Sequence, residues 1–287
     1  MNLRVSNFRI SISFFFIIIV ALALLAGLYF EVMAALLALG IHEYAHIFVG
    51  YRLGIEIYEI EILPFGGRIR SSLDEASLEK EMLMVMAGPL ANFAIAGLIL
   101  FLVTQAFIAP NIARQLIHYQ LMLGIFNMLP ALPLDGGRIF ALWLRQRFPY
   151  TLSIRIASRA GKILAYLMLS LALIGLAFKR LFLSFFVAGI FLLQQTSKEE
   201  KNAHLIFMKH LAGKKEKISK NKYMPGEIIV VNEDTPAKNI LYSFAPQKYF
   251  IVYVLDENMR IKKSLTETEI FNKVVEKGLD LMMKDLI

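Results

Sequence analysis

The sequence predicts a polytopic α-helical membrane protein with about six transmembrane helices, followed by a small α+β cytosolic domain. Hydrophobic residues make up 57% of the 287 residues and charged residues only 19%, and the mean hydropathy is +0.58. Several apolar runs approach or exceed the roughly 20 residues that a helix needs to cross a bilayer. From Lys198 onward the composition changes to one rich in Lys and Glu, which indicates a chain segment in water.

The apolar runs define the expected spans in chain order. The first follows Arg4 and Arg9, an arrangement that also suits a signal peptide, but its length favours an uncleaved span. The fourth ends at Pro130, where a helix should break. The six expected spans are Ile10–Tyr29, Val32–Tyr51, Met82–Ile108, Gln115–Leu129, Ile154–Phe178 and Leu181–Leu193.

Basic residues are distributed unequally between the two sides of this layout. Twelve of the 31 Lys and Arg residues precede the first span or lie in or near the loops on the same side, three lie on the other side, and 16 lie in the tail. Because cytoplasmic loops carry the excess of basic residues, both termini are expected in the cytoplasm of a multi-pass cell-membrane protein. The net charge of +8 then reflects topology and contact with membrane lipid, and we expect no direct nucleic-acid binding.

A segment between the second and third spans alternates apolar and acidic residues. Residues 54–62 read Gly-Ile-Glu-Ile-Tyr-Glu-Ile-Glu-Ile, and the phase slips at Tyr58-Glu59. Period two predicts a strand, and the slip predicts a bulge or a kink. A turn or re-entrant loop follows at residues 63–67. The strand would offer a free edge near the cytoplasmic mouth of the helices; an ordinary surface hairpin is the alternative.

The tail divides into a linker and a folded segment. Residues 198–222 predict a basic connecting helix or linker, and residues 223–287 predict a small α+β domain with short apolar runs. Such a short domain buries little apolar surface by itself, so pairing with a copy of itself, and hence a homo-oligomer, is expected. The absence of cysteine excludes disulfide stabilisation.

The second span contains ionisable residues where few should occur. It carries His42-Glu43-Tyr44-Ala45-His46 within an otherwise apolar sequence. Two histidines four positions apart lie on one helical face, where both imidazoles can bind one Zn2+ ion. Glu43 can then act as the general base on zinc-bound water. Ionisable groups at membrane depth are costly, so they indicate a function.

A catalytic zinc usually has three protein ligands, so a third ligand is required. The candidates in or beside the spans are Glu31, His118 and Asp135. Asp135 is favoured because it follows Pro130 and Pro133 and precedes two glycines, which allows a carboxylate to reach a site that a regular helix would hold away. His118 is better explained as an interfacial polar residue.

The motifs together resemble the site-2 protease family of intramembrane zinc metalloproteases. The resemblance is carried by His42–His46, by Ala87-Gly88-Pro89-Leu90-Ala91-Asn92, and by Asn127 with Leu134-Asp135-Gly136-Gly137. Their order, with Leu63-Pro64-Phe65-Gly66-Gly67, is most similar to the bacterial stage IV sporulation protein FB branch. The tail resembles a single cystathionine-β-synthase (CBS) domain, which that branch carries. Residues 1–197 would form the transmembrane protease domain and residues 223–287 a regulatory domain.

The resemblance also implies residue roles. His42, His46 and Asp135 would bind zinc, and Glu43 would activate the water. Five positions match the family's polar and substrate-meeting positions and would position the substrate: Asn127, Phe65, Ile60, Ile62 and Asn92. Tyr44 is bulky where this branch has a smaller residue, but it faces away from the ligand pair.

The same resemblance implies partners and regulation. The substrate would be a peptide bond of a membrane-associated precursor, specifically the pro-sequence of a sporulation sigma factor, and membrane-bound inhibitory proteins would act on the enzyme. The tail would sense ATP or another adenine nucleotide, or would serve only in assembly, since one CBS copy supplies half of the usual paired site. A substrate helix must become extended before cleavage, and pairing with the strand at Ile60 and Ile62 would supply main-chain hydrogen bonds.

Three alternatives compete with this interpretation. The His-Glu-His motif could be a chance match, although its membrane setting and the Asp135 segment disfavour that. A CBS-gated membrane zinc transporter would require polar residues along a path through the spans, and the spans offer little beyond one cluster. A non-catalytic membrane scaffold would not need Glu43 beside a metal.

Overall fold

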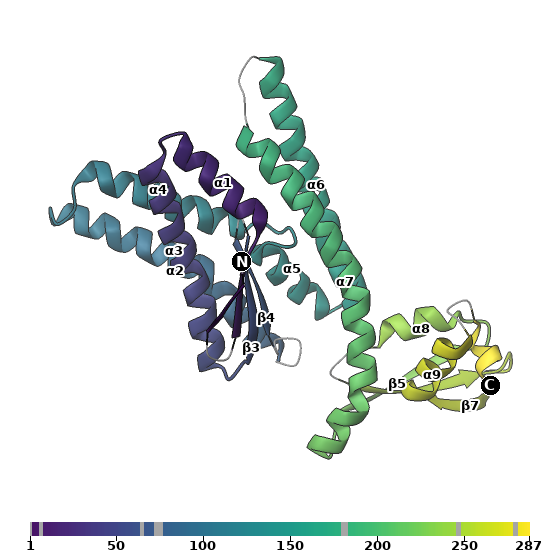
Figure 1. The fold of residues 1–287 in the computed structure, drawn as a ribbon. Coiled ribbons are helices and arrows are strands. Elements are labelled where there is room, and N and C mark those ends of the chain that lie inside the picture. The colour runs from purple at the N-terminus through teal and green to yellow at the C-terminus, as the bar shows by residue number, and fades with distance from the viewer. Residues whose placement is uncertain are drawn as a thin grey trace. The chain divides into compact units, whose positions relative to one another are not determined.

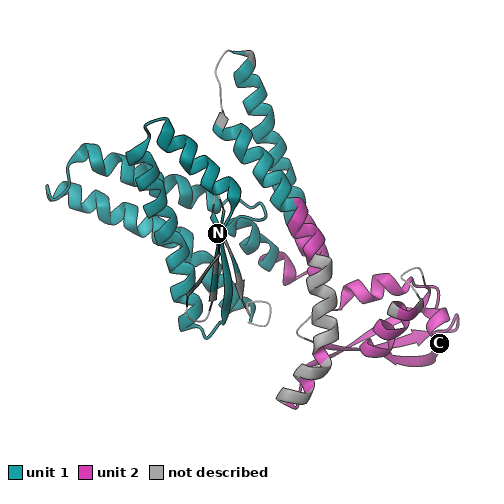
Figure 2. Ribbon diagram, viewed as in Figure 1, with its two compact units in different colours: residues 1–142, 157–196 teal, residues 143–156, 197–287 magenta. Residues whose placement is uncertain are grey.

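The structure is a computed structural model that describes residues 2–5, 8–63, 66–71, 77–178, 183–244, 248–277 and 281–287. The chain divides into two compact units, coloured separately in Figure 2. Unit 1 consists of residues 1–142 and 157–196, and unit 2 consists of residues 143–156 and 197–287. Residues 143–156, which the sequence placed in the membrane part, therefore group with the tail.

Helices dominate unit 1, and three of them continue into unit 2 or begin there (Figure 1). Helix α7 runs without interruption through the segment expected to be a linker, so residues 198–221 continue a helix that begins in unit 1. The helices are α1 (Phe14–Leu25), α2 (Tyr29–Arg52), α3 (Leu78–Thr104), α4 (Pro110–Asn127), α5 (Asp135–Arg145), α6 (Tyr150–Ala177) and α7 (Leu183–Asn221).

Within the described residues, α2, α3 and α6 are long and apolar enough to cross a membrane. They coincide with the second, third and fifth expected spans. The expected first span is wrong at its start, because Phe8–Ile12 is a strand and α1 has only 12 residues. The strand has a local cause: Arg9 and Ser11 alternate with Ile10 and Ile12, which is a period of two.

Helix α3 packs against both α2 and α4. It begins at an N-cap, where the side chain of Ser77 accepts a hydrogen bond from the backbone N–H of Lys80. Glu79 and Glu81 in the first turn complement the positive end of the helix dipole. Because α3 packs against α2, it can contribute groups to a site on α2.

A four-stranded sheet with the order β1-β2-β3-β4 belongs to unit 1. Its strands are β1 (Asn2–Val5), β2 (Phe8–Ile12), β3 (Ile57–Leu63) and β4 (Gly66–Ser71). The predicted strand and bulge are confirmed, since β3 shifts register between Ile57 and Glu59. The expected free edge on β3 is wrong, because β3 pairs in parallel with β2 and antiparallel with β4. In the described part of the chain, β4 has β3 as its one strand neighbour.

Unit 2 contains a three-stranded sheet of order β5-β6-β7 with two helices and a short 3-10 helix. Apolar residues alternate on β6, so Phe250, Val252 and Val254 are buried against the helices. Tyr150 of the segment 143–156 packs into the same core. The elements are β5 (Gly226–Asn232), α8 (Ala237–Ser243), β6 (Tyr249–Leu255), β7 (Ile261–Thr266), α9 (Glu267–Lys277) and η2 (Met283–Leu286).

A buried ion pair joins the end of α7 to the core of unit 2. The Lys214 ammonium donates to Glu267 Oε1 at 2.6 Å and to the Lys248 carbonyl oxygen at 2.7 Å. Glu267 Oε2 accepts from the Phe250 N–H at 3.1 Å. Both charged side chains are almost fully buried, so each depends on the other for compensation.

We predict that Lys214→Met lowers the stability of unit 2 by about 3–5 kcal/mol, because it leaves the Glu267 carboxylate buried and unpaired. Hydrogen exchange of residues 223–287 in the whole chain measures the change. The matched control is Lys284→Met, which removes an exposed ion pair with Asp234 and should leave the stability nearly unchanged. Equal effects of the two substitutions would contradict the prediction.

Candidate metal centre

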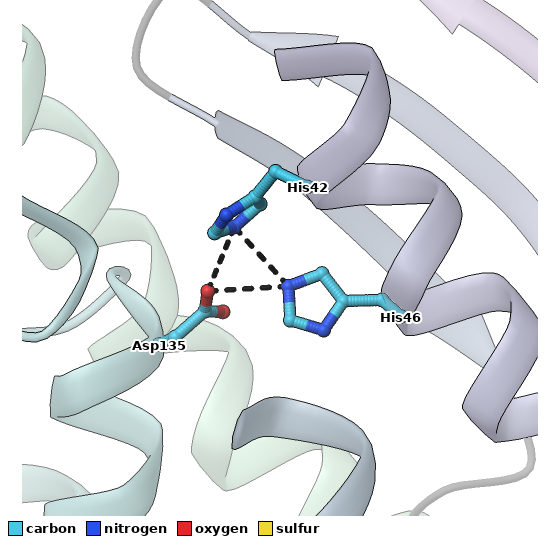
Figure 3. Close-up of side chains that lie close together, drawn as sticks. All are labelled: His42, His46 and Asp135. Atoms are coloured by element: carbon cyan, nitrogen blue, oxygen red, sulfur yellow. Dashed lines mark hydrogen bonds and ion pairs between the residues drawn. The ribbon is translucent and has the colours of Figure 1, made fainter. Parts of the chain in front are cut away.

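Two histidines from α2 and one aspartate from the start of α5 converge on one point (Figure 3). His42 Nε2 lies 3.0 Å from Asp135 Oδ2, and His46 Nε2 lies 3.2 Å from the same oxygen. The two Nε2 atoms lie 3.2 Å apart. The four-residue spacing places both imidazoles on one face of α2. Asp135, which lies 93 positions after His42 and 89 after His46, completes the cluster.

The outer nitrogens of both imidazoles are held by α3. His46 Nδ1 lies 2.8 Å from the Met84 carbonyl oxygen, and His42 Nδ1 lies 2.6 Å from Asn92 Oδ1. A carbonyl oxygen can only accept, so each Nδ1 carries the hydrogen and donates it. In the neutral imidazoles the Nε2 lone pairs then face each other and the carboxylate.

This arrangement brings three acceptors together and requires a positive species between them. Asp135 Oδ2 lies 3.0 Å from His42 Nε2 and 3.2 Å from His46 Nε2, so its carboxylate faces two further acceptors. An ionised carboxylate has no hydrogen to share. A metal cation would satisfy all three atoms at once.

The separations suit zinc. Tetrahedral zinc with bonds of about 2.0–2.1 Å places its ligand atoms about 3.3–3.4 Å apart. The three observed separations, 3.0, 3.2 and 3.2 Å, are slightly shorter than that edge. Imidazole held through its other nitrogen is also the usual form of a histidine ligand. The residues present therefore fit zinc with three protein ligands.

The loop before α5 positions Asp135 through close backbone contacts. A Cβ on Gly136 would lie 2.2 Å from the Met128 carbonyl oxygen, and a Cβ on Gly137 would lie 2.2 Å from the Ala131 carbonyl carbon. Only glycine permits that approach. The buried hydroxyl of Thr196 on α7 donates to the Leu132 carbonyl oxygen at 2.5 Å, which ties the same loop to α7.

Neither of the other candidate third ligands joins the cluster. The cluster formed by the described residues contains His42, His46 and Asp135. His118 is exposed on α4, where its ring contacts Tyr119. Glu31 lies near the start of α2 and lines a different cavity. The spatial arrangement thus separates Asp135 from the alternatives that the sequence left open.

Glu43 lies beside the cluster without belonging to it. Its side chain is buried, and Oε2 has no hydrogen-bond partner among the described residues. A Cβ on Gly67 of β4 would lie 2.2 Å from that oxygen. A buried carboxylate oxygen without a partner is costly, so its position beside a metal site indicates a chemical role.

The candidate substrate-positioning residues fall into different environments. Asn127, at the end of α4, is buried and lines a small cavity with His42 and Asp135. Asn92 is fully buried against His42 and has no exposed surface to offer a substrate. Ile60 is buried within β3 and Ile62 is half-buried, while Phe65 lies outside the described residues.

Several groups at the site were not anticipated from the sequence. Gln120 on α4 contacts Asn92, and Met84 supplies only its backbone carbonyl. Gly88 and Gly67 leave room for the imidazoles and for Glu43. A glutamine inside an apolar helix was a usable signal for Gln120. A backbone acceptor such as the Met84 carbonyl has no sequence signal, because every residue has one.

We predict that Gly88→Ala expels the metal, because the new Cβ would lie 2.3 Å from His46 Nε2 and 2.8 Å from His42 Cε1. Zinc content per purified chain should fall at least about tenfold, a loss of the size expected when the ligand environment is disturbed. Gly97→Ala on the same helix is the control, since a Cβ there meets nothing within 4 Å. Retention of zinc by Gly88→Ala would show that the imidazoles do not need this space.

Comparison with known proteins gives independent information on this site. Residues 30–119, which include His42 to His46 and Asn92, match the family model described as peptidase family M50. The chain is 34% identical over 187 residues to zinc metalloprotease MJ0392 of Methanocaldococcus jannaschii, covering 62% of this chain and 54% of that protein. It is 26% identical over 204 residues to stage IV sporulation protein FB of Bacillus subtilis, covering 71% and 70%.

A solved structure is similar as well. The site-2 protease from Methanocaldococcus jannaschii superposes with a TM-score of 0.58 at 28% identity, over 70% of this chain and 94% of that one. The match therefore extends to the fold. The chain spans about half the length of MJ0392, with 54% of that protein covered.

Proposed function

We propose, from the match of residues 30–119 to peptidase family M50 and from the similar proteins, that the chain is a zinc metalloprotease that cleaves a membrane-associated protein. The observation that carries the proposal is the cluster of two Nε2 atoms and one carboxylate oxygen with Glu43 beside it. His42, His46 and Asp135 would hold the metal. Family and site agree on the reaction class, which is hydrolysis of a peptide bond.

The zinc ligands, Glu43 and Asn127 have separate roles in the proposed reaction. Zinc held by these ligands would lower the pKa of a bound water and polarise the carbonyl that is attacked. Glu43 accepts the proton of the attacking water and delivers it to the leaving amine, a role that suits a carboxylate whose Oε2 has no partner among the described residues. Asn127, held by donation from its Nδ2 to the Leu123 carbonyl oxygen at 3.1 Å, leaves its Oδ1 toward the hairpin residue Gly66.

Substrate presentation must use a different strand from the one that the sequence indicated. β3 is interior, so Ile60 and Ile62 act by supporting the hairpin. β4 contacts the site directly, because Gly66 approaches Asn127 and Gly67 approaches Glu43. We therefore assign the pairing of an extended peptide to the outer edge of β4. Phe65, which lies outside the described residues, remains a proposed contact.

The cavities around the site differ in size and in lining. The two cavities beside the ligands each measure about 20 Å³, which holds little more than a water molecule. A third, apolar cavity of about 610 Å³ lies among α1, α2, α4, α6 and α7. It is lined by Ala38 and Leu39, about one turn before His42, and by Phe126 beside Asn127. An apolar segment of the substrate is the occupant that we propose for it.

The finer assignments rest on similarity. The match to stage IV sporulation protein FB supports a sporulation sigma-factor precursor as the substrate, with membrane-bound inhibitory proteins as regulators. The basic residues support cytoplasmic termini. The CBS resemblance alone supports an adenine nucleotide at residues 223–287, and the small size of that segment supports a homo-oligomer.

We predict that Glu43→Gln retains zinc but lowers cleavage by about 10²–10⁴-fold, the usual contribution of a general base. Co-expression with a membrane-anchored precursor, followed by product detection and metal analysis, measures both quantities. Glu79→Gln, at an exposed position of α3, is the control and should cleave normally. Undiminished cleavage by Glu43→Gln would exclude the proposed role of Glu43. If the chain were a zinc transporter instead, Glu43→Gln would keep its zinc flux.

A second prediction tests the β4 edge. Along β4, successive N–H groups point alternately toward β3 and toward the outer edge. Proline at Ile69 and proline at Arg70 should therefore differ. The variant that removes an N–H bonded to β3 should lose the hairpin. The variant that removes an N–H directed to the outer edge should keep the fold and the zinc, but its cleavage rate should fall at least about tenfold. Normal cleavage by both variants would exclude pairing at this edge.

A further inference from the structure

We infer that Asn92 and Gln120 are positioning residues, which together fix the tautomer of His42 so that its Nε2 lone pair faces the metal. The inference rests on the proposed zinc site and adds two residues to it. Asn92 lies on α3 and Gln120 on α4, and both side chains are buried. Asn92 bonds to His42, and Gln120 bonds to Asn92, so both act on the metal site through His42.

The first step is the orientation of the Asn92 amide. Its Nδ2 lies 3.2 Å from the Ala38 carbonyl oxygen and 2.5 Å from Gln120 Oε1. The Ala38 carbonyl oxygen can only accept, so the amide atom facing it must be the nitrogen. The opposite orientation would place two carbonyl oxygens against each other in a buried site. The orientation of Asn92 is thus fixed by its partners.

The second step is the consequence for His42. With Nδ2 committed to Ala38 and Gln120, Oδ1 faces His42 Nδ1 at 2.6 Å. Oδ1 accepts, so Nδ1 carries the hydrogen. In the neutral ring Nε2 then has a free lone pair, directed toward Asp135 and His46. A ligand held in this way by an outer partner binds metal more tightly than one that must first change tautomer.

The third step is the difference between the two histidines. His46 is held by the Met84 backbone carbonyl, which no side-chain substitution removes. His42 is held by a side chain, and that side chain is oriented by a second one, so its tautomer depends on residue identity at positions 92 and 120. Site geometry on α2 therefore requires particular side chains on both α3 and α4.

The packing of α4 supports the relay. Gln120, Gly124 and Asn127 are buried on one face of α4 at the spacing i, i+4, i+7. A Cβ on Gly124 would lie 2.9 Å from the Phe93 ring and 3.3 Å from Asn92 Cβ. The glycine lets α4 come close enough to α3 for Gln120 to reach Asn92. The same face carries Asn127 to the other side of the metal cluster.

The test measures metal affinity of the full-length chain in detergent. The metal-free protein is titrated with Zn2+ against a chromophoric chelator, and with Co2+ by its visible absorption. We expect Asn92→Ala to weaken Zn2+ binding by about 10–100-fold and Gln120→Leu by about tenfold, within the range for outer partners of a histidine ligand. Asn111→Ala and Gln115→Leu, at exposed positions of α4, are the controls and should bind as the unmodified chain does.

The relay predicts a specific non-additivity. Because Gln120 acts only through Asn92, the double variant Asn92→Ala/Gln120→Leu should bind Zn2+ within about twofold of Asn92→Ala alone. Asn92→Asp keeps an acceptor for His42 Nδ1, so it should retain more affinity than Asn92→Ala. A merely structural role would give additive losses and no such rescue.

The outcomes separate this inference from the proposed function. An unmodified chain that binds no Zn2+ overturns both. Normal Zn2+ binding by Asn92→Ala, or additive losses in the double variant, overturns the relay and leaves the proposed function in place. The expected pattern of affinities supports the relay, whatever substrate the chain cleaves. Asn92→Asp and Gln120→Leu nearly preserve side-chain size, so the comparison survives if Asn92→Ala fails to fold.

Discussion

The convergence of His42 Nε2, His46 Nε2 and Asp135 Oδ2 within 3.0–3.2 Å is the constraint on which the rest of unit 1 depends. Three buried acceptors repel one another unless a cation lies between them, so the fold must hold them together without the metal. Helix α3 does this by accepting from both Nδ1 atoms, and the two glycines that follow Asp135, Gly136 and Gly137, allow the loop before α5 to pack tightly against them.

Glycines decide how closely the elements approach the metal site. Gly88 makes room for the imidazoles on α3, and Gly67 brings β4 against Glu43. Gly124 allows α4 to approach Asn92. A side chain at any of these positions would push one element away from the site. Close packing thus serves the chemistry, because the ligands are fixed by their neighbours on three helices and a strand.

The sheet connects the site to the surface where a substrate would arrive. β3 is covered on both edges, and β4 lies next to Glu43 and Asn127 with its other edge outward in the described part of the chain. An extended peptide paired there would lie beside the carboxylate that must act on it. The cavities at the ligands hold little more than water, so cleavage requires the hairpin to yield space.

The sequence by itself determined the features that depend on neighbouring residues: the His42/His46 face, the strand with its bulge at Tyr58, and the apolar helices α2, α3 and α6. The tertiary structure alone decided which candidate joins the histidines, since Asp135 is 93 positions from His42. It also placed Asn92 against His42 and Gln120 against Asn92, and it made β3 an interior strand. Helical and strand periods are local, whereas contacts across such separations depend on how whole elements pack.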